Sequence, residues 1–316
     1  MAATRHTVCV LGGTGFIGSE LVARLSAARH DVVVLTRNPT RHRELLVLPS
    51  VRLVPADVHD EAQLGRAFER VDIVINLVGI LNERGLGRGR GRQFETVHAE
   101  LARKCVHACR ERRVHRYLHM SAAKADAGQG PSHYLRTKGL AENHIREACA
   151  DGSLEFVIFR PSVVFGPHDA FVNKFASILR FAPGVLPLAC ARSRFAPVYV
   201  GDVADAFMAC LDRHDVAGHT LELCGPQVMT LTDIVRETAR TLRLRRIVVP
   251  LSRGWSRLQA ALMDFVPGKP FSTDNYLSAT VDSTCESNGL ARLGITPTPL
   301  SGVLPRYFEE VAFHSP

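Results

Sequence analysis

The sequence predicts an α/β fold with a doubly wound parallel sheet and a smaller helix-rich C-terminal lobe. Short β-branched runs alternate with helical patterns over the first half of the chain, a glycine loop follows the first of these runs, and prolines interrupt the pattern after Gly166. Strands separated by helices imply right-handed crossovers, so the strands lie parallel in one sheet. We expect a first domain over residues 1–165 and a smaller substrate or partner lobe over residues 166–316.

Seven segments have the composition of buried strands. They are His6–Leu11, Asp31–Thr36, Val51–Pro55, Asp72–Leu77, Arg116–Met120, Glu155–Phe159 and His219–Leu223. An amphipathic helix is predicted at Val203–Arg213, directly before the last of them. The strand after this helix extends the sheet of the first domain, so residues 201–225 are expected to belong with that sheet.

Composition and charge indicate an ordinary globular protein with a preference for anionic partners. Of the 316 residues 46% are hydrophobic and 22% charged, and the net charge is +8. Such a surplus favours phosphorylated cofactors or acidic lipid headgroups. Nucleic acid is a disfavoured partner because the basic, glycine-rich segment at residues 84–92 has no interleaved aromatic residue, and this segment is expected to be a solvated loop.

The sequence predicts a cytoplasmic protein. Its N-terminus leads straight into the first strand without the features of a secretory signal. The longest apolar run, Val71–Leu81, contains Asp72 and Asn76 and is shorter than the roughly 20 residues that a membrane helix needs. Peripheral contact with the inner face of a membrane is left open by this argument.

The eight cysteines are scattered through apolar patterns. They are Cys9, Cys105, Cys109, Cys149, Cys190, Cys210, Cys224 and Cys285. This distribution predicts buried reduced thiols rather than disulfides. Cys105 and Cys109 share a helix face, but a metal site would need two further ligands nearby, so no metal site is predicted.

A glycine loop, Gly12-Gly13-Thr14-Gly15-Phe16-Ile17-Gly18, stands between the first strand and the first helix. Gly12 permits a tight turn, Gly15 lets the backbone approach a pyrophosphate, and Gly18 lets the helix pack closely on the strand. The helix N-terminus then faces the anion. The strand before and the helix after this loop predict a dinucleotide site of the Rossmann type in residues 1–165.

The end of the second strand indicates which dinucleotide is bound. Proteins that prefer NAD usually place an acid there for the adenosine ribose, whereas this chain has Arg37 and Asn38, with Arg41 and Arg43 close behind. An arginine pairs with a 2′-phosphate and stacks on adenine. NADP(H) is therefore favoured, with NAD(H) as the alternative and a merely solvated Arg37 as the simpler interpretation.

The third strand ends at a pair of residues that are placed to meet the adenine edge. They are Asp57 and Val58. An Asp at the end of a strand is also a common turn former, and the sequence leaves these two interpretations open.

Tyr134 and Lys138 lie one turn apart on a predicted helix after the fifth strand. A nearby ammonium favours the phenolate of a tyrosine, which then serves as a general acid or base, and it can also hold the nicotinamide ribose. Ser121 follows the fifth strand and could polarise a substrate carbonyl.

The order of these motifs resembles the short-chain dehydrogenase/reductase superfamily in its extended or atypical branch, which is NAD-dependent epimerase/dehydratase-like. Within that branch the chain is similar to the group of the nucleotide-binding accessory subunit of respiratory complex I and its bacterial relatives. The stretches that carry the match are Asn76–Gly79, Val97–His98, Tyr134–Lys138 with Glu142, Arg160–Pro167, Pro197–Ala204 and Leu293–Pro299. The resemblance covers nearly the whole chain.

The resemblance implies further cofactor contacts on both sides of the glycine loop. They are Thr14, Phe16 and Ile17 in the loop itself, Leu77, Val78 and Gly79 after the fourth strand, Lys138, and Pro161 and Val163 after the sixth strand. It also implies a catalytic set of Tyr134, Lys138, Ser121 and His98.

Two departures from the family pattern weaken the catalytic interpretation. Ala122 and Ala123 follow Ser121 where many relatives have a hydroxyl residue, so the polarising hydroxyl is Ser121, Ser132 or absent. The position that often carries an Asn for a proton relay holds His98, which is either a relay or a hydrogen-bonded packing histidine.

A segment at residues 253–266 has an apolar helical face at Trp255, Leu258, Leu262 and Phe265. A helix packed on the smaller lobe is the more typical interpretation, with a lid or an interfacial helix as the alternatives. Asp202 is interpreted as a helix cap, with a role in the substrate region as the alternative.

Two functions remain. The first is an oxidoreductase that moves a hydride between NADP(H) and a lipophilic carbonyl, for which the resemblance suggests quinones or ubiquinone-related substrates. The alternative is a non-catalytic nucleotide-binding structural or assembly protein associated with a respiratory NADH:ubiquinone oxidoreductase complex or with ubiquinone biosynthesis. Either one is compatible with a monomer or a dimer.

Overall fold

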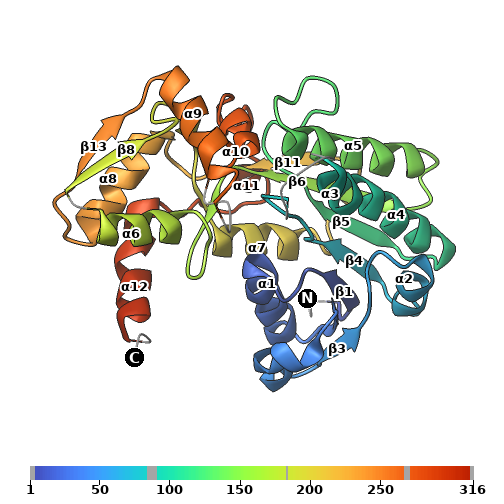
Figure 1. The fold of residues 1–316 in the computed structure, drawn as a ribbon. Coiled ribbons are helices and arrows are strands. Elements are labelled where there is room, and N and C mark those ends of the chain that lie inside the picture. The colour runs from blue at the N-terminus through green and yellow to red at the C-terminus, as the bar shows by residue number, and fades with distance from the viewer. Residues whose placement is uncertain (1–3, 84–90, 183, 267–270, 314–316) are drawn as a thin grey trace.

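The structure is a computed structural model that describes residues 4–83, 91–182, 184–266 and 271–313, with the side chains of 307 and 309–313 excepted. The basic segment at residues 84–92 therefore lies mostly outside the described residues. Two lobes stand side by side, a larger one that contains the N-terminus and a smaller one that ends in the C-terminal helix (Figure 1).

The larger lobe is built on a seven-stranded sheet with the order β11-β6-β5-β4-β1-β2-β3. All of its neighbouring strands are parallel. The strands are β1 (Thr7–Leu11), β2 (Asp31–Thr36), β3 (Val51–Pro55), β4 (Ile73–Asn76), β5 (Arg116–Met120), β6 (Glu155–Pro161) and β11 (Thr220–Leu223). The predicted doubly wound parallel sheet is confirmed, with the ends of four strands moved by one or two residues.

Two layers of helices cover the faces of this sheet. One layer holds α1 (Phe16–Ala27) and α7 (Val200–Ala209), and the other holds α2 (Glu61–Ala67), α4 (Leu101–Glu111) and α5 (His133–Ala148). A short α3 (Arg92–Phe94) and a π-helical turn (Glu95–Glu100) lead into α4. The predicted helix Val203–Arg213 is thus observed three residues earlier, as α7.

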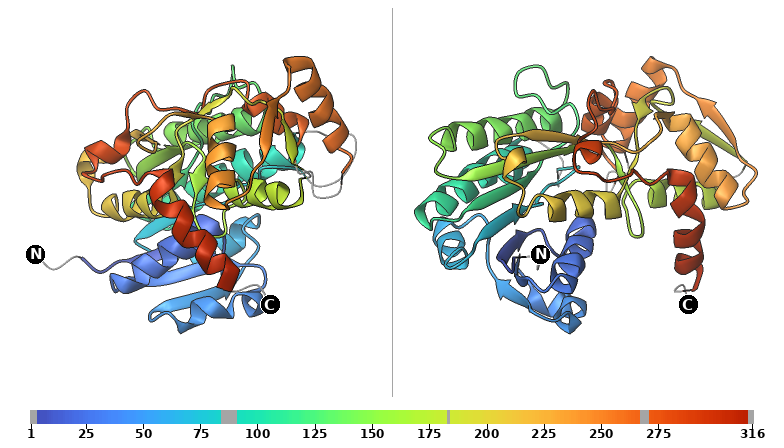
Figure 2. Two further views of the ribbon diagram at one scale, coloured as in Figure 1. Left: turned by 90° about the vertical axis from the view of Figure 1, so that its left-hand side faces the viewer. Right: turned by 180° about the vertical axis from the view of Figure 1, so that it is seen from behind.

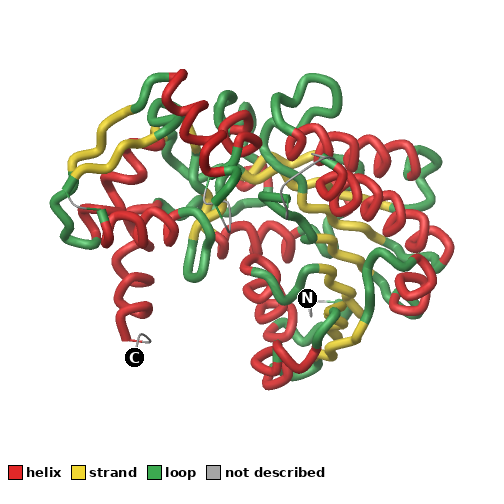
Figure 3. Tube along the Cα trace, viewed as in Figure 1, coloured by secondary structure: helices red, strands yellow, loops and turns green. Residues whose placement is uncertain are grey.

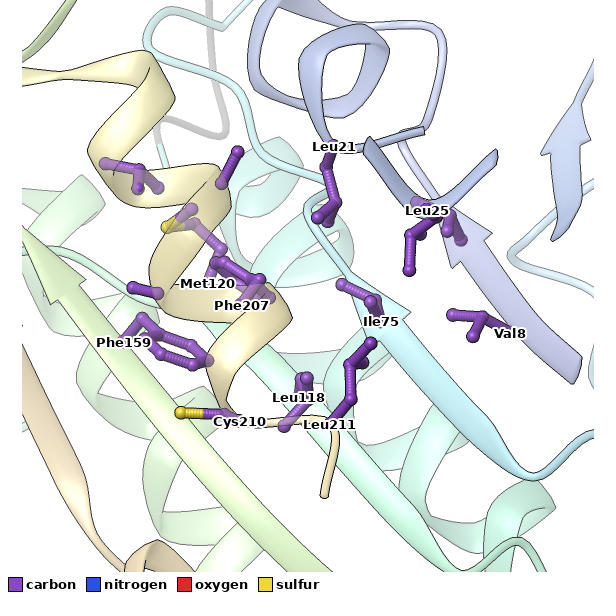
Figure 4. Packing of buried hydrophobic residues seen from close by; sticks show 14 of the residues in the cluster. Val8, Leu21, Leu25, Ile75, Leu118, Met120, Phe159, Phe207, Cys210 and Leu211 are labelled. Carbon is purple, nitrogen blue, oxygen red and sulfur yellow. The ribbon is translucent and has the colours of Figure 1, made fainter. Parts of the chain in front are cut away.

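Apolar side chains from α1 and α7 fill the space against one face of the sheet. Leu21 and Leu25 of α1 and Phe207 of α7 are fully buried there (Figure 4). The rings of Phe159 and Phe207 lie with their centroids 4.0 Å apart. Because burying a large apolar side chain contributes about 1.5–3 kcal/mol, this packing holds α7 against the sheet although it comes late in the chain.

The smaller lobe is rich in helices, as predicted (Figures 2 and 3). Its helices are α6 (Val172–Phe181), α8 (Leu231–Thr241), α9 (Arg253–Met263), α10 (Thr273–Ser278) and α12 (Leu300–Phe313). Short strand pairs connect them: β7 (Val164–Phe165) with β10 (Val198–Tyr199), β9 (Arg194–Phe195) with β12 (Met229–Thr230), and β8 (Val185–Leu188) with β13 (Ile247–Pro250). The short α11 (Gly289–Arg292) packs on β11 instead, and its Leu290 is buried in the core of the larger lobe. The expected division at residue 165 stays a prediction.

One disulfide corrects the cysteine prediction. Cys224 at the end of β11 and Cys285 are joined, with their Cα atoms 6.0 Å apart. Their segments are also tied by Asn288 Nδ2, which donates to the Cys224 carbonyl (2.7 Å). The prediction of reduced thiols is wrong for this pair, because the fold brings together two residues that are 61 positions apart. The other six cysteines are free.

The segment at residues 253–266 also differs from its expected place. Helix α9 packs on the smaller lobe through Ser256 and Ala260, which are buried. Its apolar residues Trp255, Leu258 and Leu262 are exposed, so the interpretation as an ordinary packed helix is wrong for this face. No helix in the described ranges combines the length and apolarity that crossing a bilayer requires.

Candidate functional site

The glycine loop lies where β1 meets α1, at the carboxyl edge of the sheet. Gly12 has a φ of +79°, and a Cβ there would lie 3.1 Å from the carbonyl carbon of Leu77. Gly15 is the N-cap of α1, its amide donates to the Gly12 carbonyl (3.0 Å), and no side chain caps the helix. A Cβ on Gly18 would lie 2.1 Å from the Gly12 oxygen. The tight turn requires glycine at position 12, and the close packing of helix on loop requires glycine at position 18.

This loop and the residues after β4 form a backbone cradle at the carboxyl edge of the sheet, where a pyrophosphate is expected. Thr14, Phe16 and Ile17 are half-buried along it, and the uncapped amides of the first turn of α1 offer donors to an anion. Asn76 shapes the neighbouring loop, because its Oδ1 accepts from the Val78 amide (3.0 Å).

The expected adenosine end is open to solvent. Arg37 and Asn38 directly follow β2 and are exposed, and among the described residues the Arg37 guanidinium has no ion pair or hydrogen bond. Asp57 is also exposed, and one of its oxygens accepts from the His59 amide (3.0 Å), which is the contact of a turn former. Val58 beside it is half-buried.

At the expected nicotinamide end, the segment at residues 77–79 after β4 lies next to Lys138 of α5. A Cβ on Gly79 would lie 3.3 Å from Lys138 Nζ, so a larger residue would require the ammonium to shift by a few tenths of an ångström.

Two further predicted contacts lie after β6. Pro161 ends this strand, and its carbonyl accepts from the Ala123 amide (2.9 Å). The Val163 carbonyl accepts from the Val198 amide (3.0 Å). Their backbone acceptors are therefore used within the fold, and only their side chains are left for a ligand.

His98 is buried, and both of its ring nitrogens are bonded. Nε2 accepts from the Ile80 amide (3.1 Å). Nδ1 lies 2.9 Å from Thr137 Oγ1, and that hydroxyl donates to the His133 carbonyl (2.8 Å), so His98 Nδ1 is the donor to Thr137. Burial and the Lys138 charge lower the pKa of His98 to about 2. These contacts favour the packing interpretation over a proton relay.

Tyr134 sits in the first turn of α5. Asp274 of α10 accepts from the backbone amides of His133 (2.8 Å) and Tyr134 (3.2 Å). The Tyr134 ring meets the His98 ring edge-on, with centroids 5.5 Å apart. Burial and the Asp274 charge raise the pKa of Tyr134 to about 12. The shift is opposite to the lowering that the helical spacing of Tyr134 and Lys138 led us to expect.

Lys138 is buried one turn further along α5. Its Nζ donates to the Met120 carbonyl at the end of β5 (2.8 Å). Burial lowers the pKa of Lys138 to about 8, against the opposite effect of the Glu142 charge. The ammonium is directed to the strand end, which explains why it does not act on Tyr134.

Ser121 is turned away from the expected reaction centre. It is 2% exposed, and its Oγ donates to Glu142 Oε1 (2.5 Å). Arg160 binds both oxygens of the same carboxylate (2.7 and 2.6 Å), and Arg146 adds a further contact (2.8 Å). A hydroxyl has one proton, so Ser121 cannot donate to a substrate carbonyl while this contact holds.

The second candidate hydroxyl is also occupied. Ser132 is the N-cap of α5, and its Oγ accepts from the Leu135 amide (3.1 Å) and from the Ser278 hydroxyl (2.8 Å). Its surroundings are those of a helix cap that also joins α5 to the smaller lobe.

Two acidic residues have structural roles that the sequence did not reveal. Glu142 organises the cluster around Ser121, and Asp274 joins α10 to α5 across 140 positions of sequence. Asp202 is a corrected prediction: it lies within the first turn of α7 instead of capping it and accepts from the amide (2.7 Å) and hydroxyl (2.8 Å) of Thr298. Only the Ser272 capping pattern hinted that a helix begins near Asp274.

The buried Lys138 is expected to make stability rise with pH above about 8. The folded chain loses this proton near pH 8, whereas the unfolded chain loses it near the ordinary value of about 10.4. Between these values the unfolded state binds more protons, so the free energy of unfolding rises with pH. Relative to Lys138→Met, the wild type should gain roughly 2–3 kcal/mol in urea titrations between about pH 7.5 and 10.5. A constant difference over this range would contradict the expectation.

Comparisons with known proteins agree with this geometry. The sequence model of the NAD dependent epimerase/dehydratase family matches residues 8–224. The mitochondrial NADH dehydrogenase (ubiquinone) 1 alpha subcomplex subunit 9 of Arabidopsis thaliana is 30% identical over 314 residues, which cover 93% of this chain and 75% of the plant protein. Ceramide reductase of Caulobacter vibrioides is 28% identical over 265 residues, 82% of this chain and 78% of the reductase.

Solved structures show the same fold. MoeE5 in complex with UDP-glucuronic acid and NAD has a TM-score of 0.75 and 21% identity, with 96% of this chain and 99% of MoeE5 covered. Together with the sequence relatives, this likeness confirms the resemblance that the motifs indicated.

Proposed function

Because the chain belongs to the NAD-dependent epimerase/dehydratase family, we propose that it holds NADP(H) as a structural group and associates with a respiratory NADH:ubiquinone oxidoreductase complex. In this proposal the cradle of Gly12, Gly15 and the first turn of α1 holds the pyrophosphate. Arg37 binds the 2′-phosphate, and Lys138 lies at the nicotinamide ribose. In an enzyme the bound nucleotide would supply hydride chemistry. In this proposal it instead stabilises the glycine loop and the loop after β4 by binding to both.

The hydrogen bond from Ser121 to Glu142 carries the non-catalytic part of the proposal. Carbonyl reduction needs a donor on the developing oxyanion, and this hydroxyl gives its proton to a fully buried carboxylate instead. The bonded ring of His98, which leaves neither ring nitrogen for a proton relay, supports the same conclusion. The association is supported by the relative in Arabidopsis, which is a subunit of NADH dehydrogenase by name.

The preference for NADP(H) is expected to depend on Arg37. Its guanidinium is exposed beside the end of β2 and has no partner among the described residues, so it is available to a 2′-phosphate. Arg37→Ala should weaken NADPH binding by roughly 10- to 100-fold, the effect of one charge-assisted contact, while NADH binding changes little. Isothermal titration with both nucleotides measures this. Arg52→Ala, an exposed arginine within β3, is the matched control, and wild type that binds NADH as tightly as NADPH would overturn the preference.

The structural role is tested on the protein purified under mild conditions from the membrane fraction of the cells that produce it naturally. We expect NADPH to co-purify, to remain reduced with a panel of aldehydes, ketones and quinones, and to be found with the subunits of the respiratory complex. Oxidation of the bound NADPH by any member of the panel at a rate above its spontaneous oxidation would refute the non-catalytic role.

An oxidoreductase acting on a lipophilic carbonyl or quinone-related substrate is the second candidate. The helical spacing of Tyr134 and Lys138 favours it, as does the ceramide reductase among the relatives. Tyr134→Phe separates the two functions. As a general acid, Tyr134 would contribute about 10²–10⁴-fold to turnover, whereas in the structural role the variant retains nucleotide and complex as the wild type does.

A further inference from the structure

We propose that α9 is a docking helix that lies flat on the surface of an anionic lipid bilayer. The inference concerns a surface outside the nucleotide site and does not depend on whether the nucleotide reacts. It begins from the exposed apolar face of α9, which the sheet, the nucleotide site and the core of the smaller lobe leave without a partner.

The apolar face of α9 is continuous and aromatic at both ends. Trp255 is 65% exposed, Leu258 47%, Leu262 59% and Phe265 68%. The spacing of three and four residues puts Trp255, Leu258 and Leu262 on one stripe of the helix, roughly opposite the buried Ser256 and Ala260. Phe265 lies in the turn that follows α9. Soluble proteins rarely expose such a stripe, and Trp, Leu and Phe on one side of a helix are typical of interfacial helices.

The charges around this face select an anionic surface. Arg253 and Arg257 of α9 are exposed, and neither has an ion pair among the described residues. From residue 242 to residue 266 the sequence contains five arginines and one acid, Asp264. Asp264 is buried and accepts from the Thr273 hydroxyl (2.6 Å), and the segment keeps an excess of four positive charges. Clustered arginines beside an apolar stripe match phospholipid headgroups above acyl chains.

The position of α9 makes this face accessible. The helix lies at the rim of the smaller lobe and is seen at the edge of the molecule in the left view of Figure 2. It is held firmly from beneath, because the Cys190 amide donates to Ser256 Oγ (3.3 Å) and Asp264 caps the adjoining α10 through the Thr273 amide (3.1 Å). A rigid apolar face of this kind can enter the headgroup region without unfolding.

Docking through α9 would bring the candidate site close to the bilayer. Helix α10, which follows α9, contacts the start of α5 through Asp274 and the amides of His133 and Tyr134. Asn275 of α10 also donates to the Leu81 carbonyl (3.1 Å), at the loop after β4. A single short helix, α10, therefore connects the proposed membrane-binding helix to the part of α5 that carries Tyr134.

Trp255 is the only tryptophan of the chain, so its fluorescence reports directly on α9. We expect a blue shift of its emission when the full-length protein is mixed with vesicles of phosphatidylcholine containing phosphatidylglycerol, and none with pure phosphatidylcholine. The shift should decline as salt rises from about 0.1 to 0.5 M, because screening weakens the attraction of exposed charges. Vesicle flotation measures the bound fraction independently.

Two double variants and one control complete the test. Leu258→Ser with Leu262→Ser, and separately Arg253→Gln with Arg257→Gln, should each weaken binding to anionic vesicles by about tenfold or more. Leu46→Ser with Val47→Ser changes two exposed apolar residues on the larger lobe and should bind as the wild type does. All variants should keep the wild-type nucleotide affinity, which separates this surface from the proposed function.

Three results would overturn the proposal. The first is an emission of Trp255 that anionic vesicles leave unchanged. The second is a blue shift that appears without vesicles as the protein concentration rises, together with a dimer on sedimentation, which would assign the face to a second copy of this chain. The third is equal binding to neutral and anionic vesicles at all salt concentrations, which would remove the role of the arginines.

Discussion

Replacement of Glu142 by alanine is expected to lower the free energy of unfolding by about 3–5 kcal/mol, the loss typical of breaking a buried charge pair. The carboxylate is fully buried and accepts from Ser121, Arg160 and Arg146. Without it the Arg160 guanidinium and the Ser121 hydroxyl lose their acceptor in a site that water reaches poorly. Urea denaturation near pH 7 measures the change.

The control for this variant is Glu237→Ala. Glu237 pairs with Arg240 on the surface of α8, where a charge pair contributes about 0–1 kcal/mol. Glu142→Gln, which keeps one oxygen for Ser121, should lie between the two. A loss of less than about 1 kcal/mol for Glu142→Ala would mean that water or a shifted side chain replaces the carboxylate, and the argument that Ser121 is held away from substrate would then fail.

The second large effect is expected at Gly18. An alanine Cβ there would lie 2.1 Å from the Gly12 oxygen and 2.6 Å from the Gly13 Cα, and both are backbone atoms of the cradle itself. Helix α1 must move away from the loop, which should cost about 1–3 kcal/mol of stability, as overpacking does elsewhere. The same movement misplaces the first-turn amides, so we expect nucleotide affinity to fall by about tenfold or more.

Gly254→Ala provides the matched control for Gly18→Ala. Gly254 lies in the first turn of α9, and a Cβ there would meet no atom within 4 Å. Alanine should leave stability unchanged or raise it by up to about 1 kcal/mol, because glycine is a poor helix former. Thermal unfolding and isothermal titration of both variants test the pair. Equal nucleotide affinity in Gly18→Ala and the wild type would show that the pyrophosphate is not held by this loop.

The features that sequence determined are local or periodic. Each strand of the sheet was predictable because a run of β-branched residues between helical patterns has few other ways to bury its side chains, as in Asp31–Thr36. The roles of Gly12 and Gly18 were predictable because a strand, a tight turn and a helix follow one another directly along the chain. Family membership followed from the order of these motifs.

The chemistry of the site was decided by contacts between distant segments. Ser121, Tyr134 and His98 have residue types that suit catalysis, but their protons and pKa values depend on Glu142, Asp274 and Ile80, which the sequence does not place beside them. The Cys224–Cys285 disulfide was missed for the same reason, and the exposed face of α9 was only the alternative to a packed helix. The sequence reveals which side chains are titratable and which are apolar enough to be buried. Hydrogen-bond partners and desolvation are set by neighbours in space, and only the tertiary structure supplies those neighbours.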